Sequence, residues 1–485
     1  MSKKKNILIR ISFFRGIPDF GNLAMEQLTS KKPKITSIHN VLNEFKKCNG
    51  CNRKRKYLNE FQICKSCYKP MTAFIPSGNK VVDDFIKHTL TNRNEMAGKM
   101  EFVPYDRFKD IEFIAEGGFS KVYKATWIDG PISYWNHKKL KYDSYGEMKV
   151  VLKKLHNTKN INSRGLNELK IFYNFTQSMT SYDPYDNDGY YPYVNKCYGI
   201  TQDPITKDFA IIIKYYESGD LTHYLLNDFF NHSWLDKLNI LNYIVLGLKN
   251  LHNANIIHGD IRDGNVFLEN NVAIIGDLGL SKSALVHDDS NEIYGVIPFF
   301  APENFVKPIY TKASDIYGFG MIMWELMTGR RPLWDRDHDI ELIHEICDGL
   351  RPPIVTNAPE GYIDLMQMCW HHDPTKRPTI TEIESKIKNI LLIESDNYHE
   401  SNPTKIIKSS DIGPVTINNP SGIYESNSLS LIMSTESTRS LTEIDSYQSD
   451  EGSFNEDKRR LDNNLIEDED TKKIRLSEND DDGIA

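Results

Sequence analysis

Between Tyr105 and Leu392 the hydrophobic pattern changes its period once, and this change restricts the folds that the chain can adopt. Before Gly219 most apolar residues form short strand-like runs, at Phe108–Ala115, Lys121–Trp127, Met148–Leu152, Tyr198–Thr201 and Phe209–Lys214. One helical pattern, at Leu166–Phe175, lies among these runs. After Gly219 apolar residues recur at helical spacing, as in Trp234–Asn253 and Ser314–Thr328. The sequence therefore predicts an α+β fold with two lobes, a five-stranded sheet with one helix and then a mainly helical lobe.

Charge and composition separate this block from both ends of the chain. The net charge over 485 residues is −8, but residues 1–100 contain 20 Lys and Arg against 7 Asp and Glu, whereas residues 394–485 contain 9 against 21. The acidic end is rich in Ser and Asn and has no sustained apolar period, so it cannot bury enough apolar surface to fold alone. We predict five regions: a basic segment (1–47), a cysteine segment (48–67), a linker (68–104) with a helix at Val81–Leu90, the two-lobed domain (105–393) and a disordered acidic tail (394–485).

Composition also excludes several classes of protein. Seven cysteines are too few for a disulfide scaffold, and no apolar run approaches the roughly 18 residues that a membrane span needs. Arg10 and Arg15 interrupt the apolar stretch near the N-terminus, so we do not expect a secretory signal. We expect a soluble protein of the cytoplasm, or of the nucleus, because the basic clusters Lys458–Arg460 and Lys472–Arg475 resemble a two-part nuclear signal.

Short motifs with polar and small residues follow one another in the helical lobe. They are His258–Asn265 (HGDIRDGN), Asp277–Gly279 (DLG), Ala301–Glu303 (APE), Asp315–Gly320 (DIYGFG) and Cys369–Pro378 (CWHHDPTKRP). In this order they resemble the H-x-D-x-x-x-x-N, D-x-G and A-P-E signatures of eukaryotic protein kinases, and the last resembles the segment with D-P-x-x-R-P in tyrosine-kinase and tyrosine-kinase-like members. The resemblance covers about residues 105–393 and implies the bilobal protein kinase fold.

The resemblance implies an enzyme that transfers the γ-phosphate of ATP to hydroxyl groups of protein substrates with the help of Mg²⁺. Asp260 would accept the proton of the substrate hydroxyl, and Arg262 would lie near the transferred phosphate. Asn265 and Asp277 would bind the Mg²⁺ ions. Because phosphoryl transfer depends mainly on positioning and on the placement of cations, these few side chains suffice.

A lysine on the third strand completes the implied site. Lys153 would hold the α- and β-phosphates of ATP and be oriented by Glu168, because a buried ammonium needs a partner. Lys154 competes for this role. Strand alternation places the two lysines on opposite faces, so only one of them can point inward.

Two further segments would bind the nucleotide. The hairpin between the first two strands partly matches G-x-G-x-x-G-x-V, where small residues allow backbone N–H groups to approach phosphates. Its residues are Ala115, Glu116, Gly117, Gly118, Phe119, Ser120 and Val122. Adenine would lie against a hinge formed by Lys214, Tyr215 and Tyr216, with Ile213 as the gatekeeping residue. Glu303 would pair with Arg377 in a structural role.

Three departures from the family pattern leave questions open. Gly259 replaces the arginine that usually pairs with a phosphorylated activation loop, which argues against control through that contact. Leu278 replaces Phe, and Val296 replaces a Thr that is usual in Ser/Thr kinases. Substrate choice between Ser/Thr and Tyr stays open, and we favour Ser/Thr. The alternative is a pseudokinase that serves as a nucleotide-binding scaffold, although the residues needed for the mechanism are all present.

Cys48, Cys51, Cys64 and Cys67 form the pattern C-x2-C-x12-C-x2-C. Two such pairs can close a tetrahedral site, so we predict one structural Zn²⁺. Buried thiols are the simpler alternative. The basic run Arg53–Lys56 lies between the pairs and is expected to be a solvated turn rather than a nucleic-acid contact. A zinc-dependent module that docks on an acidic partner is a further hypothesis for this basic region.

Overall fold

The structure is a computed structural model that describes residues 46–49, 53–55, 62–91, 98–118, 120–159, 161, 165–178, 193–284, 294–307, 309–415 and 419–429. All of these described residues belong to one compact unit. The predicted basic segment, apart from its last two residues, and the predicted nuclear-signal clusters lie outside the described residues.

The small lobe is built on a six-stranded sheet with the order β3-β9-β10-β8-β5-β4. The strands are β3 (Glu101–Phe102), β4 (Phe108–Glu116), β5 (Ser120–Trp127), β8 (Met148–Leu155), β9 (Cys197–Gln202) and β10 (Phe209–Lys214). Five of them match the predicted strands, and the sixth, β3, pairs in parallel with β9. Its backbone comes so close to Gly199 that a Cβ at this position would lie 2.0 Å from the carbonyl oxygen of Glu101.

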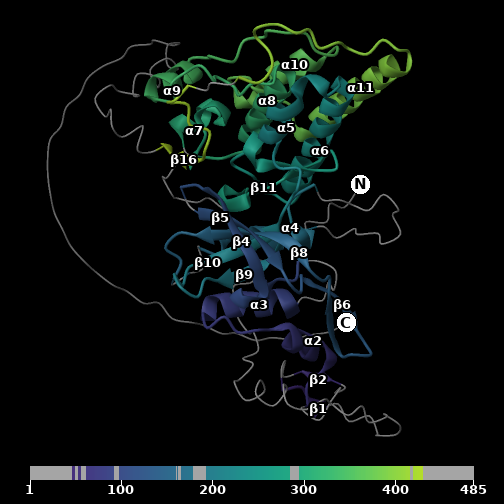
Figure 1. Cartoon of the computed structure of the whole chain (residues 1–485), viewed down its shortest axis with the longest axis vertical. Coiled ribbons are helices and arrows are strands. Elements are labelled where there is room, and N and C mark those ends of the chain that lie inside the picture. Colours follow the sequence, from purple (N-terminus) through teal and green to yellow (C-terminus); the bar gives the residue numbers. More distant parts are fainter. Residues whose placement is uncertain are drawn as a thin grey trace, which may run out of the picture. The chain divides into compact units, whose positions relative to one another are not determined.

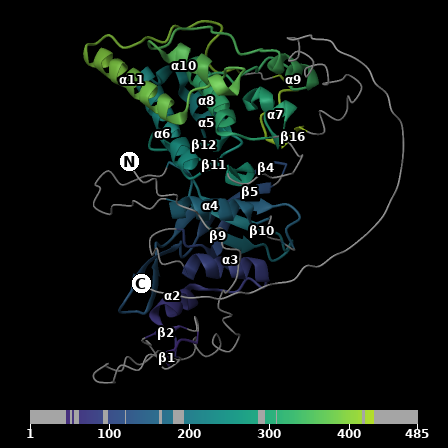
Figure 2. The same ribbon diagram turned by 180° about the vertical axis from the view of Figure 1, so that it is seen from behind.

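Two helices pack beside this sheet. Helix α4 (Asn167–Ser178) is the one predicted from the sequence, and α3 (Lys80–Thr91) lies in the region that we expected to be a linker. Figures 1 and 2 both show α3 next to β9. Phe85 of α3 meets Tyr173 of α4 edge to face, with ring centroids 6.1 Å apart. The predicted helix Val81–Leu90 is therefore confirmed, and it belongs to the small lobe because its apolar face is buried there.

The long connection between β5 and β8 forms a hairpin of β6 (Ile132–Asn136) and β7 (Lys141–Ser144) that the sequence analysis did not predict. The cysteine segment, with β1 (Lys46–Lys47), β2 (Lys54–Arg55) and α2 (Lys65–Ala73), packs against it. Trp135 of β6 is the centre of this contact, because its ring lies 6.2 Å from that of Tyr68 and 5.1 Å from that of Tyr142.

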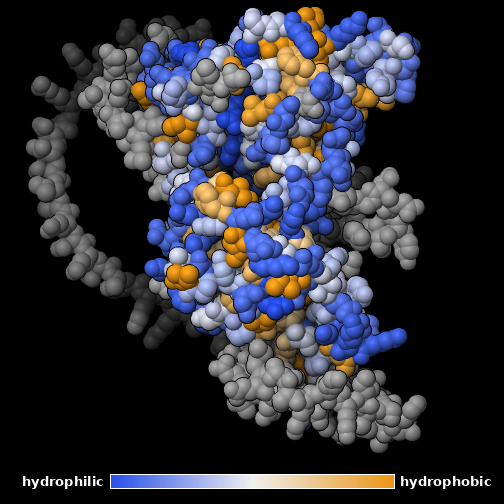
Figure 3. Space-filling model, viewed as in Figure 1, coloured by the Kyte–Doolittle hydropathy of each residue, from blue (hydrophilic) through white to orange (hydrophobic). Residues whose placement is uncertain are grey.

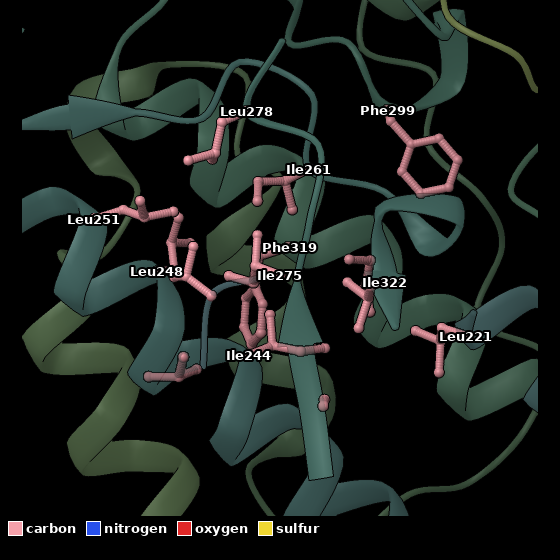
Figure 4. Packing of buried hydrophobic residues seen from close by; sticks show 14 of the residues in the cluster. Leu221, Ile244, Leu248, Leu251, Ile261, Ile275, Leu278, Phe299, Phe319 and Ile322 are labelled. Carbon is pink, nitrogen blue, oxygen red and sulfur yellow. The ribbon is translucent and has the colours of Figure 1, made fainter. Parts of the chain in front are cut away.

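The large lobe is mainly helical. Its helices are α5 (Leu221–Asp228), α6 (Trp234–Asn253), α7 (Pro302–Val306), α8 (Lys312–Thr328), α9 (Ile340–Cys347), α10 (Tyr362–Cys369) and α11 (Ile380–His399). Short strands join them: β11 (Ile256–Ile257), β12 (Val266–Glu269), β13 (Val272–Ile275), β14 (Lys282–Ser283), β15 (Tyr294–Gly295) and β16 (Asn427–Ser428). Helix α8 is buried along nearly its whole length, and Figure 4 shows Phe319 of α8 beside Ile275, Ile244 and Leu248. Ile261 and Leu278, which lie in the H-x-D and D-x-G motifs, belong to this core, so the core holds the motif-bearing loops in place.

The prediction that the chain is disordered from residue 394 is wrong for residues 394–415 and 419–429. Ile412, Tyr424 and Leu429 are 5, 7 and 2% exposed, and Arg330 donates a hydrogen bond of 3.1 Å to the carbonyl of Gly413. The polar composition hid this packing, because a few widely spaced apolar residues anchor the segment to a lobe that is already folded. Residues 430–485 lie outside the described residues.

Hydrophilic side chains cover most of the face drawn in Figure 3, and hydrophobic ones occur there in small separate groups. Among the described residues, no helix is both long enough and apolar enough to cross a membrane.

Replacement of a buried residue of α3 tests whether this helix belongs to the small lobe. Ile86 is fully buried, so Ile86→Ala should lower the free energy of unfolding by about 2–5 kcal/mol. Val81→Ala, on the 38% exposed Val81 of the same helix, is the control and should cost much less. Chemical denaturation of the full chain measures both. Equal midpoints for the two variants would show that α3 does not contribute to the core.

Candidate active site

A three-residue ionic cluster joins the two lobes. Lys153 of β8 places Nζ 3.2 Å from Oε2 of Glu168 on α4 and 2.5 Å from Oδ1 of Asp277, which follows β13. Lys154 points to the other face of the sheet and pairs with Asp203 at 2.8 Å. Of the two candidate lysines, Lys153 is thus the one that points inward, in the pair with Glu168 that we predicted.

The ion pairs shift the pKa values of Lys153 and Asp277 in opposite directions. Burial alone would lower the pKa of the Lys153 ammonium, but the negative charges of Asp277 and Glu168 outweigh burial and raise that pKa above its ordinary value. Burial would raise the pKa of the Asp277 carboxyl, yet the charge of Lys153 dominates and lowers it. At neutral pH the site therefore holds a cation beside a carboxylate, which is the combination that phosphate and a divalent ion require.

The backbone at the D-x-G motif is bent so that the Asp277 side chain faces this cluster. Asp277 has a φ of 51° and accepts a hydrogen bond of 3.0 Å from the N–H of Gly279. A Cβ on Gly279 would lie 2.9 Å from Oδ1 of Asp277 and 3.2 Å from Nζ of Lys153. The glycine at this position therefore leaves room for the ionic cluster itself.

A second group of side chains surrounds Asp260, which is 8% exposed. Nδ2 of Asn265 donates hydrogen bonds to the backbone oxygen of Asp260 at 2.8 Å and to its Oδ2 at 2.9 Å. Nε of Arg262 lies 3.4 Å from the same Oδ2. Because the amide nitrogen of Asn265 is engaged in this way, its oxygen is the atom that can serve as a metal ligand.

Buried Asp315 at the start of α8 holds the loop that carries Asp260. Its Oδ2 accepts from the N–H of His258 and its Oδ1 from the N–H of Gly259, both at 2.9 Å. His252 at the end of α6 approaches Oδ2 at 2.8 Å. Sequence analysis found Asp315 only as part of a motif and missed this anchoring role. Asp315 is the fourth residue of a mainly apolar helix, which marks it as unusual but does not say which groups its carboxylate binds.

Gly259 explains part of the departure from the family pattern. Its φ of +83° lies in the left-handed region, which favours glycine. This conformation turns two successive N–H groups, those of His258 and Gly259, toward the same carboxylate of Asp315. The residue at 259 thus serves the loop through its backbone.

The other predicted positions lie around the two groups. The hairpin between β4 and β5 is closed by a hydrogen bond of 2.9 Å from Gly117 to Ser120, and Phe119 is outside the described residues. Beyond Ile213, which is 9% exposed, Tyr216 stacks on Phe267 with ring centroids 5.7 Å apart. The Tyr216 hydroxyl also donates to Asn195 at 3.0 Å. The hinge is therefore fixed from the large-lobe side.

The remaining structural predictions also have clear outcomes. Arg377 forms a two-pronged ion pair with Glu303, with both N–O distances 2.7 Å, as we predicted. Leu278 is fully buried in the main core, so an aliphatic residue fills the place of the usual Phe. Val296 is buried, and so it contributes packing where a hydroxyl is usual.

Three cysteines of the N-terminal segment also converge. The sulfur atoms of Cys48, Cys64 and Cys67 all lie within 4.8 Å of one another and are buried. The N–H of Cys64 donates to Sγ of Cys48 at 3.2 Å. Cys51, the fourth predicted ligand, lies outside the described residues.

Comparison with known proteins places this geometry in a family. Residues 108–387, more than half of the chain, match the sequence profile described as "Protein tyrosine and serine/threonine kinase". Similar proteins include the "Probable serine/threonine-protein kinase kinX" of Dictyostelium discoideum, 28% identical over 59% of this chain and 24% of the relative. "Cyclic GMP-binding protein C" of the same organism is 29% identical over 58% of this chain and 11% of its own.

A viral relative covers more of its own length. "Tyrosine-protein kinase transforming protein ros" of UR2 avian sarcoma virus is 27% identical over 62% of this chain and 73% of the relative. The chain thus spans a quarter or less of the length of the two Dictyostelium relatives. The relatives carry both serine/threonine and tyrosine kinase names, so the likeness extends to the domain and not to one class of hydroxyl.

Removal of the Asp315 carboxylate tests the anchoring of the Asp260 loop. Asp315→Ala leaves two buried N–H groups without an acceptor, and each costs about 1–3 kcal/mol. We therefore expect a marked loss in the free energy of unfolding and faster amide exchange at residues 258–260. Asp315→Asn retains one acceptor oxygen and should lose less. Asp364→Ala, at an exposed position of α10, is the control; an Asp315→Ala variant as stable as this control would refute the role.

Proposed function

Because the chain belongs to the family of protein tyrosine and serine/threonine kinases, we propose that it transfers the γ-phosphate of ATP to serine or threonine hydroxyls of protein substrates. The observation that carries this proposal is the convergence of Lys153, Glu168 and Asp277 in one ionic cluster. A scaffold has no need of these charges, since packed apolar residues in place of a buried ion pair are often equally stable.

Each side chain has a task in the proposed reaction. Lys153, held by Glu168, binds the α- and β-phosphates, and the Gly117–Gly118 turn covers them. Asp260 accepts the proton of the substrate hydroxyl as its oxygen forms a bond to the γ-phosphorus. The bond from this phosphorus to the β–γ bridging oxygen breaks, and ADP leaves. Arg262, beside Asp260, stabilises the negative charge on the transferred group.

The donor set fits Mg²⁺, because this ion prefers oxygen ligands and Asp277 and Asn265 offer a carboxylate and an amide oxygen. When bound there, Mg²⁺ neutralises charge on the phosphate oxygens. Asp277 would then contact both Lys153 and the ion. The lowered pKa of Asp277 favours this, because it keeps the carboxylate charged.

The observations constrain the substrate hydroxyl, serine and threonine or tyrosine, less than they constrain the phosphoryl transfer itself. We favour serine and threonine because relatives such as kinX carry that name, while the viral relative is named a tyrosine kinase. Phosphoamino-acid analysis of a phosphorylated protein mixture separates the two classes. Phosphotyrosine alone would overturn the preference but not the kinase activity.

Paired substitutions on β8 test the activity. Lys153→Met removes the phosphate-binding cation and should reduce phosphoryl transfer at least about 100-fold, and Asp277→Ala should do the same. Lys154→Met is the matched control, because Lys154 points to the opposite face and pairs with Asp203. Its rate should equal that of the wild type. The assay follows transfer from labelled ATP with Mg²⁺ to a general protein substrate.

Wild-type turnover no greater than that of Lys153→Met would end the enzyme proposal. ATP binding by the same wild-type protein would then favour the alternative, a pseudokinase that binds nucleotide as a scaffold.

We also propose that the cysteine segment binds one structural Zn²⁺. Three buried thiols within 4.8 Å of one another match the sulfur separations of a tetrahedral site, in which each Zn–S distance is about 2.3 Å. The N–H of Cys64 bonded to Sγ of Cys48 supports a thiolate there. The contact between this segment and Trp135 would let the metal stiffen the β6–β7 hairpin of the small lobe.

Metal analysis of the full chain, purified without chelator, tests the zinc proposal. We expect about one equivalent of zinc in the wild type and a large loss in Cys64→Ser. Cys347→Ser, at a cysteine of the large lobe far along the chain, is the control and should keep its zinc. Zinc-free wild-type protein would refute the proposal.

A further inference from the structure

The segment Asn419–Leu429 crosses the large lobe toward the motif-bearing loops. Its N-terminal part is held by backbone groups, with the N–H of Asn419 bonded to the carbonyl of Trp334 at 3.4 Å and the N–H of His338 bonded to that of Ser421 at 3.3 Å. Figures 1 and 2 both show its last part, β16, beside α7. The segment is thus bound to the lobe over most of its length.

Strand β16 adds to the end of the loop that follows the D-x-G motif. Asn427 and Ser428 pair antiparallel with Gly295 and Tyr294 of β15. Strand addition of this kind recognises an extended peptide through its backbone and leaves specificity to side-chain pockets. The surface at β15 is therefore suited to bind an extended peptide, and the chain's own tail occupies it.

Tyr424 anchors the segment beside the proposed proton acceptor. The Tyr424 ring is 7% exposed, the Arg331 guanidinium lies 4.6 Å from its centre, and its hydroxyl donates to the carbonyl of Pro332 at 3.0 Å. The carbonyl of Tyr424 lies 3.4 Å from Nη1 of Arg262. Nε of the same guanidinium lies 3.4 Å from Oδ2 of Asp260. One arginine thus bridges Asp260 and the tail backbone.

Leu429 fills an apolar pocket directly after the added strand. It is 2% exposed and belongs to a cluster separate from the main core. The buried members of this cluster are Ile257, Ile297, Phe300, Phe305, Tyr310, Leu333, Leu342, Ile343 and Ile346. A peptide bound as the tail is bound would therefore need an apolar side chain at this position.

Ser426 lies between these two points of contact. It lies two positions after Tyr424, whose carbonyl contacts Arg262, and immediately before β16. Its Oγ is buried and has no hydrogen-bond partner among the described residues. No hydrogen bond to another described residue therefore has to break before this hydroxyl can act as an acceptor. The hydroxyl of Tyr424, in contrast, is engaged by Pro332.

We infer that Asn419–Leu429 is bound as an intramolecular substrate, and that Ser426 is the phosphate acceptor. This inference rests on the proposed kinase activity and deepens it. The substrate class of the site is an extended peptide with a serine three residues before an apolar side chain and a tyrosine two residues before the serine. Ser426 is the first serine after Tyr424, whose carbonyl contacts the same Arg262 guanidinium that contacts Asp260.

The chemical step balances with ATP as the phosphate donor. Oγ of Ser426 forms a bond to the γ-phosphorus, the bond from that phosphorus to the β–γ bridging oxygen breaks, and Asp260 takes the hydroxyl proton. The products are phosphoserine 426 and ADP. Until this happens the bound tail excludes other peptides, so their apparent affinity is reduced by the fraction of molecules with an empty site. Because Oγ of Ser426 is buried when the tail is bound, the transfer requires a local outward shift of the segment, and the added phosphate would prevent its return.

Two measurements on the full chain test the inference. In the first, the wild type is incubated with ATP and Mg²⁺, and phosphosites are mapped by mass spectrometry. We expect Ser426 to be modified at a rate per molecule that does not depend on protein concentration. Phosphorylation of a general protein substrate with no modification of Ser426 would overturn the acceptor assignment while leaving the kinase proposal intact.

The second measurement uses two synthetic peptides, NPSGIYESNSL and its form ending in Asp, and two variants of the full chain. Leu429→Asp places a charge in the apolar pocket, so it should lower the KM for the first peptide at least about tenfold and speed amide exchange at residues 427–429. Ile423→Asp is the control, because Ile423 is 46% exposed in the same segment, and should change neither quantity. The peptide ending in Asp should be a poor substrate.

The possible outcomes separate the two proposals. Equal KM values and equal exchange in Leu429→Asp and Ile423→Asp would overturn the bound-tail inference alone. Absence of phosphoryl transfer to any substrate, in the wild type and in Leu429→Asp alike, would overturn the kinase proposal and this inference with it. Slower exchange at residues 427–429 in the wild type than in Leu429→Asp, together with modified Ser426, would support both.

Discussion

The buried ammonium group of Lys153 is the point on which the arrangement of the two lobes depends. Its strand belongs to the sheet, its first partner Glu168 belongs to α4, and its second partner Asp277 belongs to the large lobe. A buried charge is costly unless it is paired, so each partner holds the other elements in place. The same pairing raises the pKa of the lysine and lowers that of Asp277, which preserves both charges for a phosphate ligand. Structure and proposed chemistry thus rest on one interaction.

Sequence could predict this cluster because each member lies in a short motif at a fixed place in the order of elements. The choice between Lys153 and Lys154 was open, since strand alternation says that only one faces inward and does not say which. Pairing within the sheet decides it, by turning Lys154 toward Asp203. The anchoring role of Asp315 was not predictable, because it joins N–H groups 56 and 57 positions away in the chain. Contacts of that range leave no local pattern.

The packing of the segments on either side of the predicted domain was not predictable, for a different reason. Helix α3 is amphipathic and its pattern was found, but the pattern alone does not say what covers the apolar face, which is the surface of α4 and its neighbours. The tail has few apolar residues, and composition correctly says that it cannot fold alone. It becomes ordered because Tyr424 and Leu429 enter pockets that the large lobe has already formed. Composition indicates whether a segment can fold alone. Docking onto a folded lobe requires far fewer apolar residues.

These two docked segments, α3 and the tail, bear on the question of how the site is ordered without an arginine at position 259. Helix α4, which carries Glu168, is supported by the contact of its Tyr173 with Phe85 of α3, so the Lys153 pair has support from outside the loop that follows Asp277. The end of that loop, β15, is held by the strand β16 and by Tyr310, whose hydroxyl donates to the carbonyl of Tyr294 at 2.9 Å. Segments outside the predicted domain therefore supply the order that a charged contact at 259 would otherwise provide. The tail that we infer to occupy the peptide surface would therefore both order the loop and compete with substrate.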